Sequence, residues 1–186
     1  MPKKQKQCYA APTVLRPFDK DDEDSVRVVI ETPKGCRNKY KFEPELGVFV
    51  LSTVLPEGMS FPYDFGFVPS TQADDGDPLD VLLLMDAPAF PGCVIDCRLV
   101  GVIEGEQTED GETERNDRLI AVANENHEYS NVQNISDINK TLLKDVGEFF
   151  VNYHKLRGTK FKVLGTRGPK QARRLLEKAM RGLKAA

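Results

Sequence analysis

Apolar and polar residues alternate along much of this chain with the period of two that is typical of β-strands. Residues 25–31 show the pattern clearly, because Val26, Val28 and Ile30 share one face and turn residues follow at 33–35. Residues 39–42 and 47–52 are expected to form a hairpin around the turn at 44–47. Further strands are predicted at 81–85, 94–104, 118–123 and 159–164.

The spacing of apolar residues becomes helical near the C-terminus. Apolar residues recur on one face between a predicted N-cap at Ser136 and the helix-ending Gly158. A second amphipathic stripe, with a basic opposite face, spans residues 169–185. Many short strands followed by two helices, without βαβ alternation, predict an α+β domain built on a barrel or a curled antiparallel sheet.

Three polar stretches are expected to lie outside the core. Residues 1–18 are predicted to be a flexible N-terminal segment, and residues 19–186 a single domain. The acidic run 19–24 is expected to be a solvated loop. Residues 106–117 are almost wholly polar and acidic, which predicts a loop or the tip of a hairpin.

The composition narrows the classes of protein that this chain can be. Its 186 residues, 40% of them hydrophobic, are enough for the core of one domain. A net charge of −3 gives no overall attraction to nucleic acid. Neither a membrane-spanning apolar run nor the apolar core of a signal peptide is evident. We therefore expect a cytoplasmic protein with no nucleic-acid or membrane partner, whose cysteines are reduced thiols.

The strongest chemical signal is the acidic segment 74–80, which precedes the apolar run 81–85. Its aspartates lie close together in the sequence and repel one another, so either solvent screens them or a cation binds among them. Gly76 and Pro78 place these acids on a turn that the following strand would anchor. Oxygen ligands without a neighbouring Cys or His suit Mg²⁺, Mn²⁺ or Ca²⁺, and an acidic surface turn is the alternative interpretation.

The residues DGDPLDV at 75–81 resemble the Asp-Gly-Asp-Pro-hydrophobic-Asp-hydrophobic signature of the family I soluble inorganic pyrophosphatases. The resemblance covers roughly residues 25–165, because segments around Glu31, Lys39, 61–69 and Tyr153 follow in the family's order. It implies an OB-like five-stranded β-barrel core with two C-terminal helices packed on it. It also implies a homo-oligomer, either a hexamer or a dimer.

The activity implied by the resemblance is hydrolysis of inorganic pyrophosphate to two phosphates by an Mg²⁺-activated water, with Mn²⁺ as a possible substitute. In this family the outer acids of the signature bind metal and the middle acid activates the water. That implies Asp75 and Asp80 as metal ligands and Asp77 as the general base. Asp117 is the further metal ligand implied on the other side of the site. The implied phosphate-binding residues are Glu31, Lys39, Arg118 and Tyr153.

Several residues depart from the family's pattern. Lys41 stands in place of a glutamate, Phe61 and Phe65 in place of tyrosines, and His154 in place of a lysine. Arg118 stands where the family generally has lysine, which keeps the charge but changes its geometry. These departures leave open a catalytically impaired phosphate- or nucleotide-binding homologue, or a hydrolase of another small phosphoanhydride.

The acidic hairpin can be aligned with the family's pattern in more than one way. Counting back from Arg118, the gap-free partner of a family metal-binding aspartate is Asn116, and Asp117 lies one residue away. On a strand, a shift of one residue reverses the face unless a bulge restores it. Glu109 and Asp110, with Glu106 behind them, are the candidates for a second acid on this side.

Overall fold

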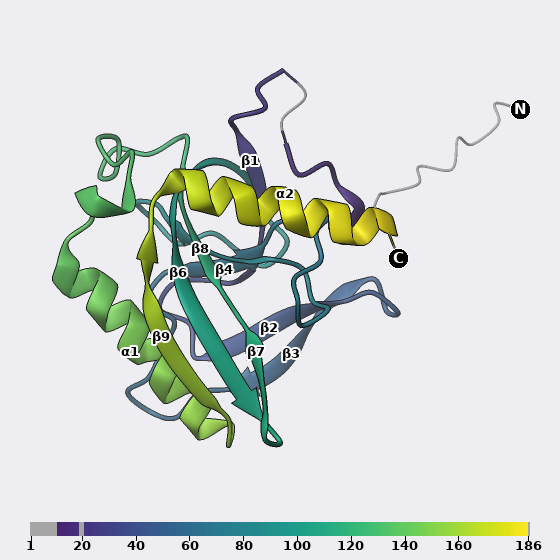
Figure 1. Ribbon diagram of the computed structural model, residues 1–186, viewed down its shortest axis with the longest axis vertical. Coiled ribbons are helices and arrows are strands. Elements are labelled where there is room, and N and C mark those ends of the chain that lie inside the picture. The colour runs from purple at the N-terminus through teal and green to yellow at the C-terminus, as the bar shows by residue number, and fades with distance from the viewer. Residues whose placement is uncertain (1–10, 19–20, 186) are drawn as a thin grey trace, which may run out of the picture.

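The computed structural model describes residues 11–18 and 21–185 (Figure 1). The predicted flexible segment 1–18 and acidic loop 19–24 therefore lie partly outside the described residues. The described part of the first segment contacts the domain: Pro12–Val14 forms the short helix η1, and Phe18 forms a β-bridge with Val26. Ser70 also donates its backbone N–H to the carbonyl of Thr13 at 2.8 Å.

Within the described residues, seven strands form one sheet and two strands form a separate hairpin. The sheet contains β1 (Val26–Thr32), β4 (Asp64–Phe67), β5 (Asp80–Leu84), β6 (Val94–Glu109), β7 (Glu112–Arg115), β8 (Arg118–Ala123) and β9 (Lys160–Arg167). The hairpin contains β2 (Asn38–Glu43) and β3 (Val48–Val54), as predicted. The strand order β1-β4-β5-β8-β6 closes into a ring through pairing of β1 with β6. The fold is therefore α+β with the expected barrel-like core.

The long strand β6 makes this closure possible. It pairs with β1, β8, β7 and β9 along its length and is bent by irregularities in register near Gly101 and Gly105. A Cβ at Gly105 would lie 2.3 Å from the ring of Phe161, and one at Gly101 would lie 2.6 Å from the carbonyl oxygen of Arg167. Only glycine allows such close approach, so these two positions bring β9 against β6.

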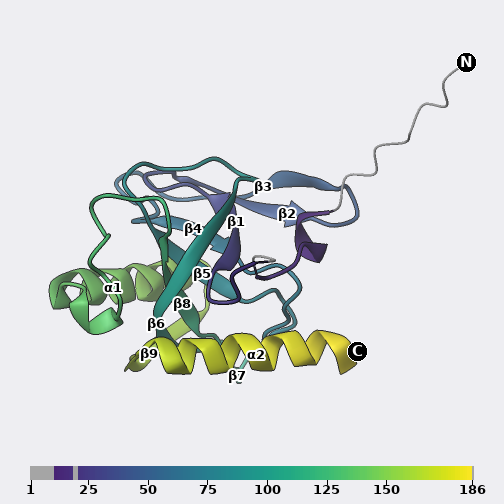
Figure 2. The same cartoon turned by 90° about the horizontal axis from the view of Figure 1, so that it is seen from above.

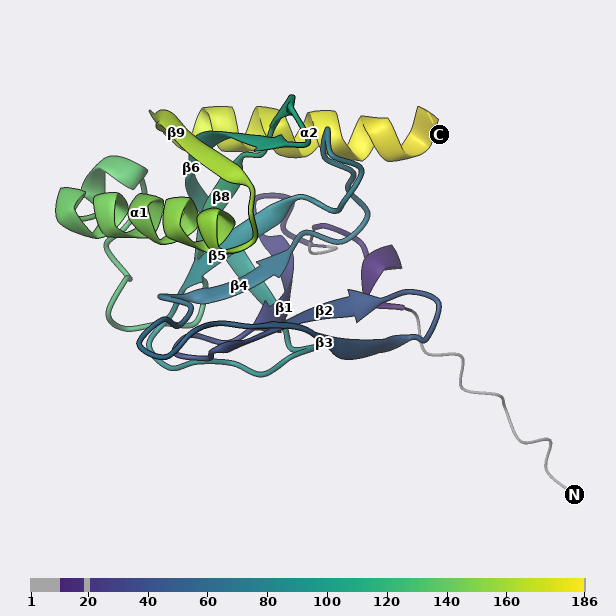
Figure 3. The same cartoon turned by 90° about the horizontal axis from the view of Figure 1, so that it is seen from below.

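Two helices cover different parts of the ring. The helix α2 (Pro169–Ala185) lies on the side opposite the β2–β3 hairpin (Figures 2 and 3). Its Ala172, Leu176 and Ala179 pack in the same buried cluster as Leu83 of β5. The helix α1 (Lys140–Leu156) contributes to a second cluster that includes Leu82. Successive residues of β5 thus face different clusters, which explains why the run 81–85 is apolar on both faces.

The start of α1 differs from the prediction. Ser136 lies in a separate short helix, η2 (Ile135–Asp137), which is capped by Asn134. Ile138 is extended, and Asn139 caps α1 by accepting a hydrogen bond from the backbone N–H of Thr141 at 2.8 Å. Ser136 as the N-cap of this helix was therefore wrong, because two successive asparagine caps divide the segment.

Among the described residues, no helix is both long enough and apolar enough to span a membrane.

Candidate active site

The site forms where β5 and β8 begin side by side. These two strands are parallel, whereas the other paired strands of the sheet are antiparallel. Val81 pairs with Leu119, so the preceding residues Asp80 and Arg118 are neighbours. Their side chains form an ion pair with 2.8 Å between Nη1 and Oδ2. The sheet topology thus brings together two residues that are far apart in the sequence.

A tight turn presents the other two acids of the signature. The turn closes by hydrogen bonds from the backbone N–H of Ala73 to the carbonyl of Asp77 (2.7 Å) and of Gly76 to that of Ala73 (3.1 Å). Gly76 has a φ of 87°, a left-handed conformation that favours glycine. Asp75 accepts a hydrogen bond from the backbone N–H of Asp77 at 3.2 Å. Both acids are exposed, so packing does not fix their side chains.

Glu31 lies with these aspartates, and together Glu31, Asp75, Asp77 and Asp80 form what we call the loop wall. Burial raises the pKa of Glu31 to about 7, and the charges of Asp80 and Asp77 add to this effect. Partial desolvation by the surrounding protein, together with the charges of Asp80 and Asp77, also raises the pKa of Asp75, although its side chain remains accessible to solvent. Burial, with a contribution from Asp77, raises the pKa of Asp80 against the opposing charges of Arg118 and Lys39. The loop wall is therefore a set of carboxylates that destabilise one another.

Lys39 and Tyr153 lie at the aromatic edge of this site. The ammonium of Lys39 lies over the rings of Phe65 and Tyr153, at 5.5 and 5.3 Å from their centroids. Within the described part of the chain, Lys39 has no ion pair. Tyr153 is buried, and its hydroxyl accepts a hydrogen bond from Arg157 at 3.1 Å. An ammonium held by rings remains available to an anion.

His154 does not supply the positive charge of the lysine that it replaces. It is buried, and its ring stacks on Phe161 with 4.9 Å between centroids. Its Nδ1 lies 3.0 Å from the hydroxyl oxygen of Thr159. Burial, together with the nearby charge of Arg118, lowers the pKa of His154 to about 3. The imidazole is therefore neutral at physiological pH.

Opposite the loop wall lies the segment Arg115–Arg118, which we call the hairpin wall. Asn116 faces Arg118 and accepts a hydrogen bond from its Nη1, while Asp117 points to the other face. The oxygen Oδ1 of Asp117 accepts hydrogen bonds from the backbone N–H of Gly105 at 3.0 Å and from Arg115 at 2.7 Å. The structure therefore does not bring Asp117 together with Asp75 and Asp80.

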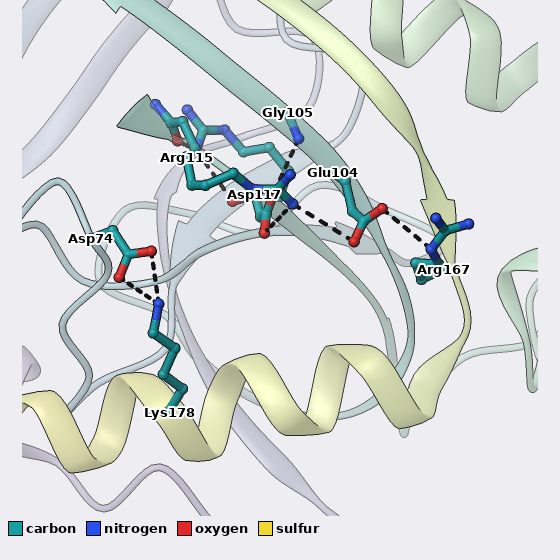
Figure 4. A network of polar contacts seen from close by, with 9 residues as sticks. Asp74, Glu104, Gly105, Arg115, Asp117, Arg167 and Lys178 are labelled. Carbon is teal, nitrogen blue, oxygen red and sulfur yellow. Dashed lines mark hydrogen bonds and ion pairs between the residues drawn. The ribbon is translucent and has the colours of Figure 1, made fainter. Parts of the chain in front are cut away.

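Figure 4 shows the ion pairs that continue from Asp117. Arg115 also lies 3.6 Å from Glu104, which in turn pairs with Arg167 at 3.3 Å. A cavity of about 620 Å³ is lined by Arg115 and Asp117 of this network and by residues of α2. Across the cavity Lys178 binds Asp74 at 2.7 Å. Asp117 and Asp74 are thus each neutralised by a basic side chain.

Several other acids of the hairpin line a second cavity on the other side of Arg115. A smaller cavity of about 240 Å³ is lined by Asp75, Asn116, Glu109 and Asp110, among others, but not by Glu106. Glu109 and Asp110 therefore share a cleft with Asp75, as the sequence left open. Arg115 lines both cavities and was not singled out from the sequence. The available signal was the Arg-Asn-Asp-Arg pattern at 115–118, in which an arginine stands at each end.

The donor set of the loop wall fits a hard divalent cation. Its donors are carboxylate oxygens whose mutual repulsion a cation would relieve, and such oxygens are the ligands of Mg²⁺ and Mn²⁺. Among the residues that the structure describes, no three His, Cys, Asp or Glu side chains are already grouped to hold an ion. Binding would therefore require rotation of the exposed Asp75 and Asp77 side chains.

The sequence and the fold of this chain are both similar to those of known proteins. A family model described as inorganic pyrophosphatase matches residues 28–184. The inorganic pyrophosphatase of Nostoc sp. is 36% identical over 159 residues, covering 86% of this chain and 92% of the relative. That of Geobacillus stearothermophilus is 37% identical over 155 residues, covering 83% and 92%. The crystal structure of inorganic pyrophosphatase from Thermus thermophilus superposes with a TM-score of 0.86 at 35% identity, covering 94% of this chain and 99% of that one.

Proposed function

This chain belongs to the inorganic pyrophosphatase family, and from that premise we propose how its residues hydrolyse inorganic pyrophosphate to two phosphates. The observation that carries the proposal is the meeting of Asp80 and Arg118 at the start of β5 and β8, beside the turn that holds Asp75 and Asp77. Carboxylates and basic groups thereby lie within one site, as cleavage of a highly charged anhydride requires.

We propose that Asp75 and Asp80 hold the divalent cation on which the family depends, and that this ion is Mg²⁺, with Mn²⁺ able to replace it. When bound, such a cation neutralises phosphate charge and lowers the pKa of a coordinated water. The raised pKa values of both aspartates support this assignment, because a cation nearby would favour their ionised forms. Asp80 would also keep its ion pair with Arg118.

Asp77 is the proposed general base. It lies between the two proposed ligands on the same turn and is exposed, so its carboxylate is free to accept a proton from an attacking water. General base catalysis of this kind contributes a factor of about 10²–10⁴ in rate. Asp74, in the same turn, is bound to Lys178 instead and has no proposed role in the reaction.

The phosphate groups are proposed to contact Lys39, Arg118, Tyr153 and Glu31. The ammonium of Lys39 has ring contacts only within the described residues, so it can bind a phosphate oxygen without first losing an ion pair. Glu31, with a pKa near 7, can carry a proton and donate it in a hydrogen bond to phosphate, whereas a carboxylate would repel the substrate. The ring of Tyr153 contacts the ammonium of Lys39 and helps to hold it in place.

Asp117 remains a proposed ligand only under two conditions. Its oxygens accept hydrogen bonds from Arg115 and from the backbone of Gly105. It would reach a cation only after Arg115 releases it and the start of β8 shifts in register. Glu109 and Asp110, which line the cleft beside Asp75, require no such change.

We propose the cytoplasm as the compartment and a homo-oligomer, a hexamer or a dimer, as the assembly. Cys36, Cys93 and Cys97 are free thiols, which supports a reducing compartment. Leu51 and Val54 of the hairpin, with Phe90, are exposed apolar residues that an interface between copies would cover. Light scattering of the purified protein measures the number of copies directly.

An alternative is a catalytically impaired phosphate- or nucleotide-binding homologue, or a hydrolase of another small phosphoanhydride. The hairpin wall favours it, because Asn116 is neutral and Asp117 is already neutralised by Arg115. Under this alternative the loop wall would bind a cation and phosphate without cleaving pyrophosphate.

The deciding experiment measures phosphate release from pyrophosphate by the purified protein with Mg²⁺, with Mn²⁺ and without metal. Release that requires metal and is lost in Asp77→Asn supports the proposal. Inorganic triphosphate is assayed in parallel, so that cleavage of triphosphate alone would indicate the other phosphoanhydride. Folded protein that binds metal and pyrophosphate but releases no phosphate would support the impaired homologue.

A further inference from the structure

The ring of Tyr153 contacts two cationic side chains at the edge of the site. The ammonium of Lys39 lies 5.3 Å from the ring centroid, and the guanidinium carbon of Arg157 lies 5.7 Å from it. Nη1 of Arg157 also donates a hydrogen bond to the hydroxyl oxygen of Tyr153 at 3.1 Å. One aromatic side chain therefore brings together a positive charge from β2 and another from the end of α1.

Packing and backbone hydrogen bonds hold Tyr153 and Arg157 in position. Tyr153 is 4% exposed, and its ring centroid lies 6.1 Å from that of Phe149 and 6.0 Å from that of Phe61. Arg157 follows Tyr153 by four residues, so the two side chains lie on the same face of the helix. The backbone N–H of Arg157 donates to the carbonyl of His154 at 3.0 Å, which fixes the point from which the guanidinium extends.

The charge of Arg157 is not neutralised by an acidic side chain within the part of the chain that the structure describes. Neither Arg157 nor Lys39 forms an ion pair there. His154 is buried beside them. Burial lowers its pKa to about 3, together with the charges of Arg118, Arg157 and Lys39. Three cations thus lie around one neutral imidazole, and their mutual repulsion favours an anion among them.

We propose that Arg157 is a further substrate-binding residue, which binds, together with Lys39, the phosphate group of pyrophosphate that lies beside Tyr153. A guanidinium has five N–H donors in a planar fork that matches phosphate oxygens, so donors remain after the hydrogen bond to Tyr153. Arg157 is exposed, so an anion can reach it from solvent. The inference rests on the proposed function in taking pyrophosphate as the ligand.

The test measures binding of methylenediphosphonate, a pyrophosphate analogue whose bridging carbon resists hydrolysis, by calorimetry with Mg²⁺ present. Arg157→Met should weaken binding about tenfold, the loss expected when a hydrogen bond to a charged group is removed. Lys155→Met is the matched control, because it removes one exposed positive charge from the same turn of α1. It should leave the affinity within about twofold, since solvent and salt screen an exposed charge.

Two further variants separate the charge of Arg157 from its shape. Arg157→Lys keeps the charge but loses the planar fork, so it should recover only part of the affinity. Arg157→Gln keeps a donor for the Tyr153 hydroxyl but loses the charge, so it should bind as weakly as Arg157→Met. Arg157→Gln also serves as the test if Arg157→Met does not fold.

Steady-state kinetics with pyrophosphate distinguish binding of substrate from a structural role. Arg157→Met should raise KM and leave kcat nearly unchanged, because the contact is made equally in the bound substrate and in the transition state. A lower urea midpoint with an unchanged KM would show that Arg157 only stabilises the end of α1, and this would overturn the proposal. Equal losses of affinity in Arg157→Met and Lys155→Met would overturn it too, because any positive charge on this turn would then suffice.

Phosphate release by the native protein separates this proposal from the proposed function. Binding of methylenediphosphonate that depends on Arg157, without phosphate release from pyrophosphate, would overturn the hydrolase and leave the role of Arg157 intact. Phosphate release by the native protein, together with native affinity and KM in folded Arg157→Met, would do the opposite.

Discussion

The loop wall and the hairpin wall face the same site, but their acidic side chains have different surroundings. In the loop wall, Glu31, Asp75 and Asp80 have raised pKa values because burial and neighbouring carboxylates oppose their ionisation. In the hairpin wall, Arg115 binds Asp117 and Arg118 binds Asn116. Two unit charges about 4 Å apart interact by about 4 kcal/mol at an effective dielectric constant of 20. The acids of the loop wall therefore oppose one another's ionisation, whereas Asp117 in the hairpin wall is neutralised by Arg115.

The largest effect is expected from removing the proposed general base of the loop wall. Asp77→Asn should lower phosphate release by about 10²–10⁴-fold, because the amide cannot accept the proton of the attacking water. Mn²⁺ affinity, measured by calorimetry, should change little because Asp75 and Asp80 remain. Asp74→Asn is the matched control in the same turn and should keep its activity within about threefold. Equal losses in both variants would mean that the turn, and not the base, had been disturbed.

The ion pair between Arg115 and Asp117 in the hairpin wall can be removed by mutation of Arg115. Arg115→Met should lower the free energy of unfolding by about 1–3 kcal/mol, because Asp117, whose side chain is 7% exposed, loses its charged partner. Urea unfolding at pH 7 measures this change. A variant as stable as the native protein would show that the backbone N–H of Gly105 suffices for Asp117.

The loop wall should show a characteristic pH dependence without metal. The folded pKa of Glu31, about 7, lies above its ordinary value of 4.5, so between these pH values the folded state holds a proton that the unfolded state has released. The free energy of unfolding should therefore fall as the pH rises from about 4.5 to 7 and level off above 7. Asp75 and Asp80 contribute with the same sign.

Urea midpoints at pH 5, 6, 7 and 8 measure this slope. Glu31→Gln should reduce it, whereas Glu112→Gln on the exposed hairpin should not. Added Mn²⁺ should restore stability at pH 8 in the native protein. If Glu31→Gln leaves the pH dependence of stability unchanged, Glu31 does not contribute to it.

The smallest effect is expected where the turn meets α2. Lys178→Met removes the ion pair with Asp74. The side chain of Lys178 is 64% exposed and that of Asp74 is 50% exposed. Such pairs contribute about 0–1 kcal/mol, so the thermal midpoint should move by only a few degrees. A charge-reversed pair, Asp74→Lys with Lys178→Asp, should recover what the single variant loses. A large loss of stability would mean that α2 holds the turn mainly through this contact.

Much of the fold follows from local patterns in the sequence. The hairpin of β2 and β3, the buried strand β5 and the helix at 169–185 each occupy the segments whose periodicity predicted them. The end of α1 is also as predicted, with Gly158 at a φ of 77° just beyond it. The error at Ser136 arose because several possible capping residues lie close together, and Asn134 and Asn139 cap two separate helices there.

Less of the candidate site could be predicted from the sequence. The signature acids could be named because they are adjacent along the chain. The pairing of Asp80 with Arg118 could not, since it depends on a parallel register that no local pattern encodes. The face of Asp117 depended equally on whether a bulge interrupts the start of β8, and the structure places it with Arg115. The assignment of each site residue to metal, proton or phosphate stays a prediction.

The parallel pairing of β5 with β8 also has a kinetic consequence. No tight turn can join parallel strands, and here the chain must pass through β6 and β7 before Leu119 can reach Val81. Contacts between residues distant in sequence form slowly in folding, because the entropy of closing the intervening loop is lost before they form. During refolding, the capacity to bind an ion should therefore return after the β2–β3 hairpin has formed. A newly made chain would carry its cluster of aspartates unneutralised until the last stages of folding.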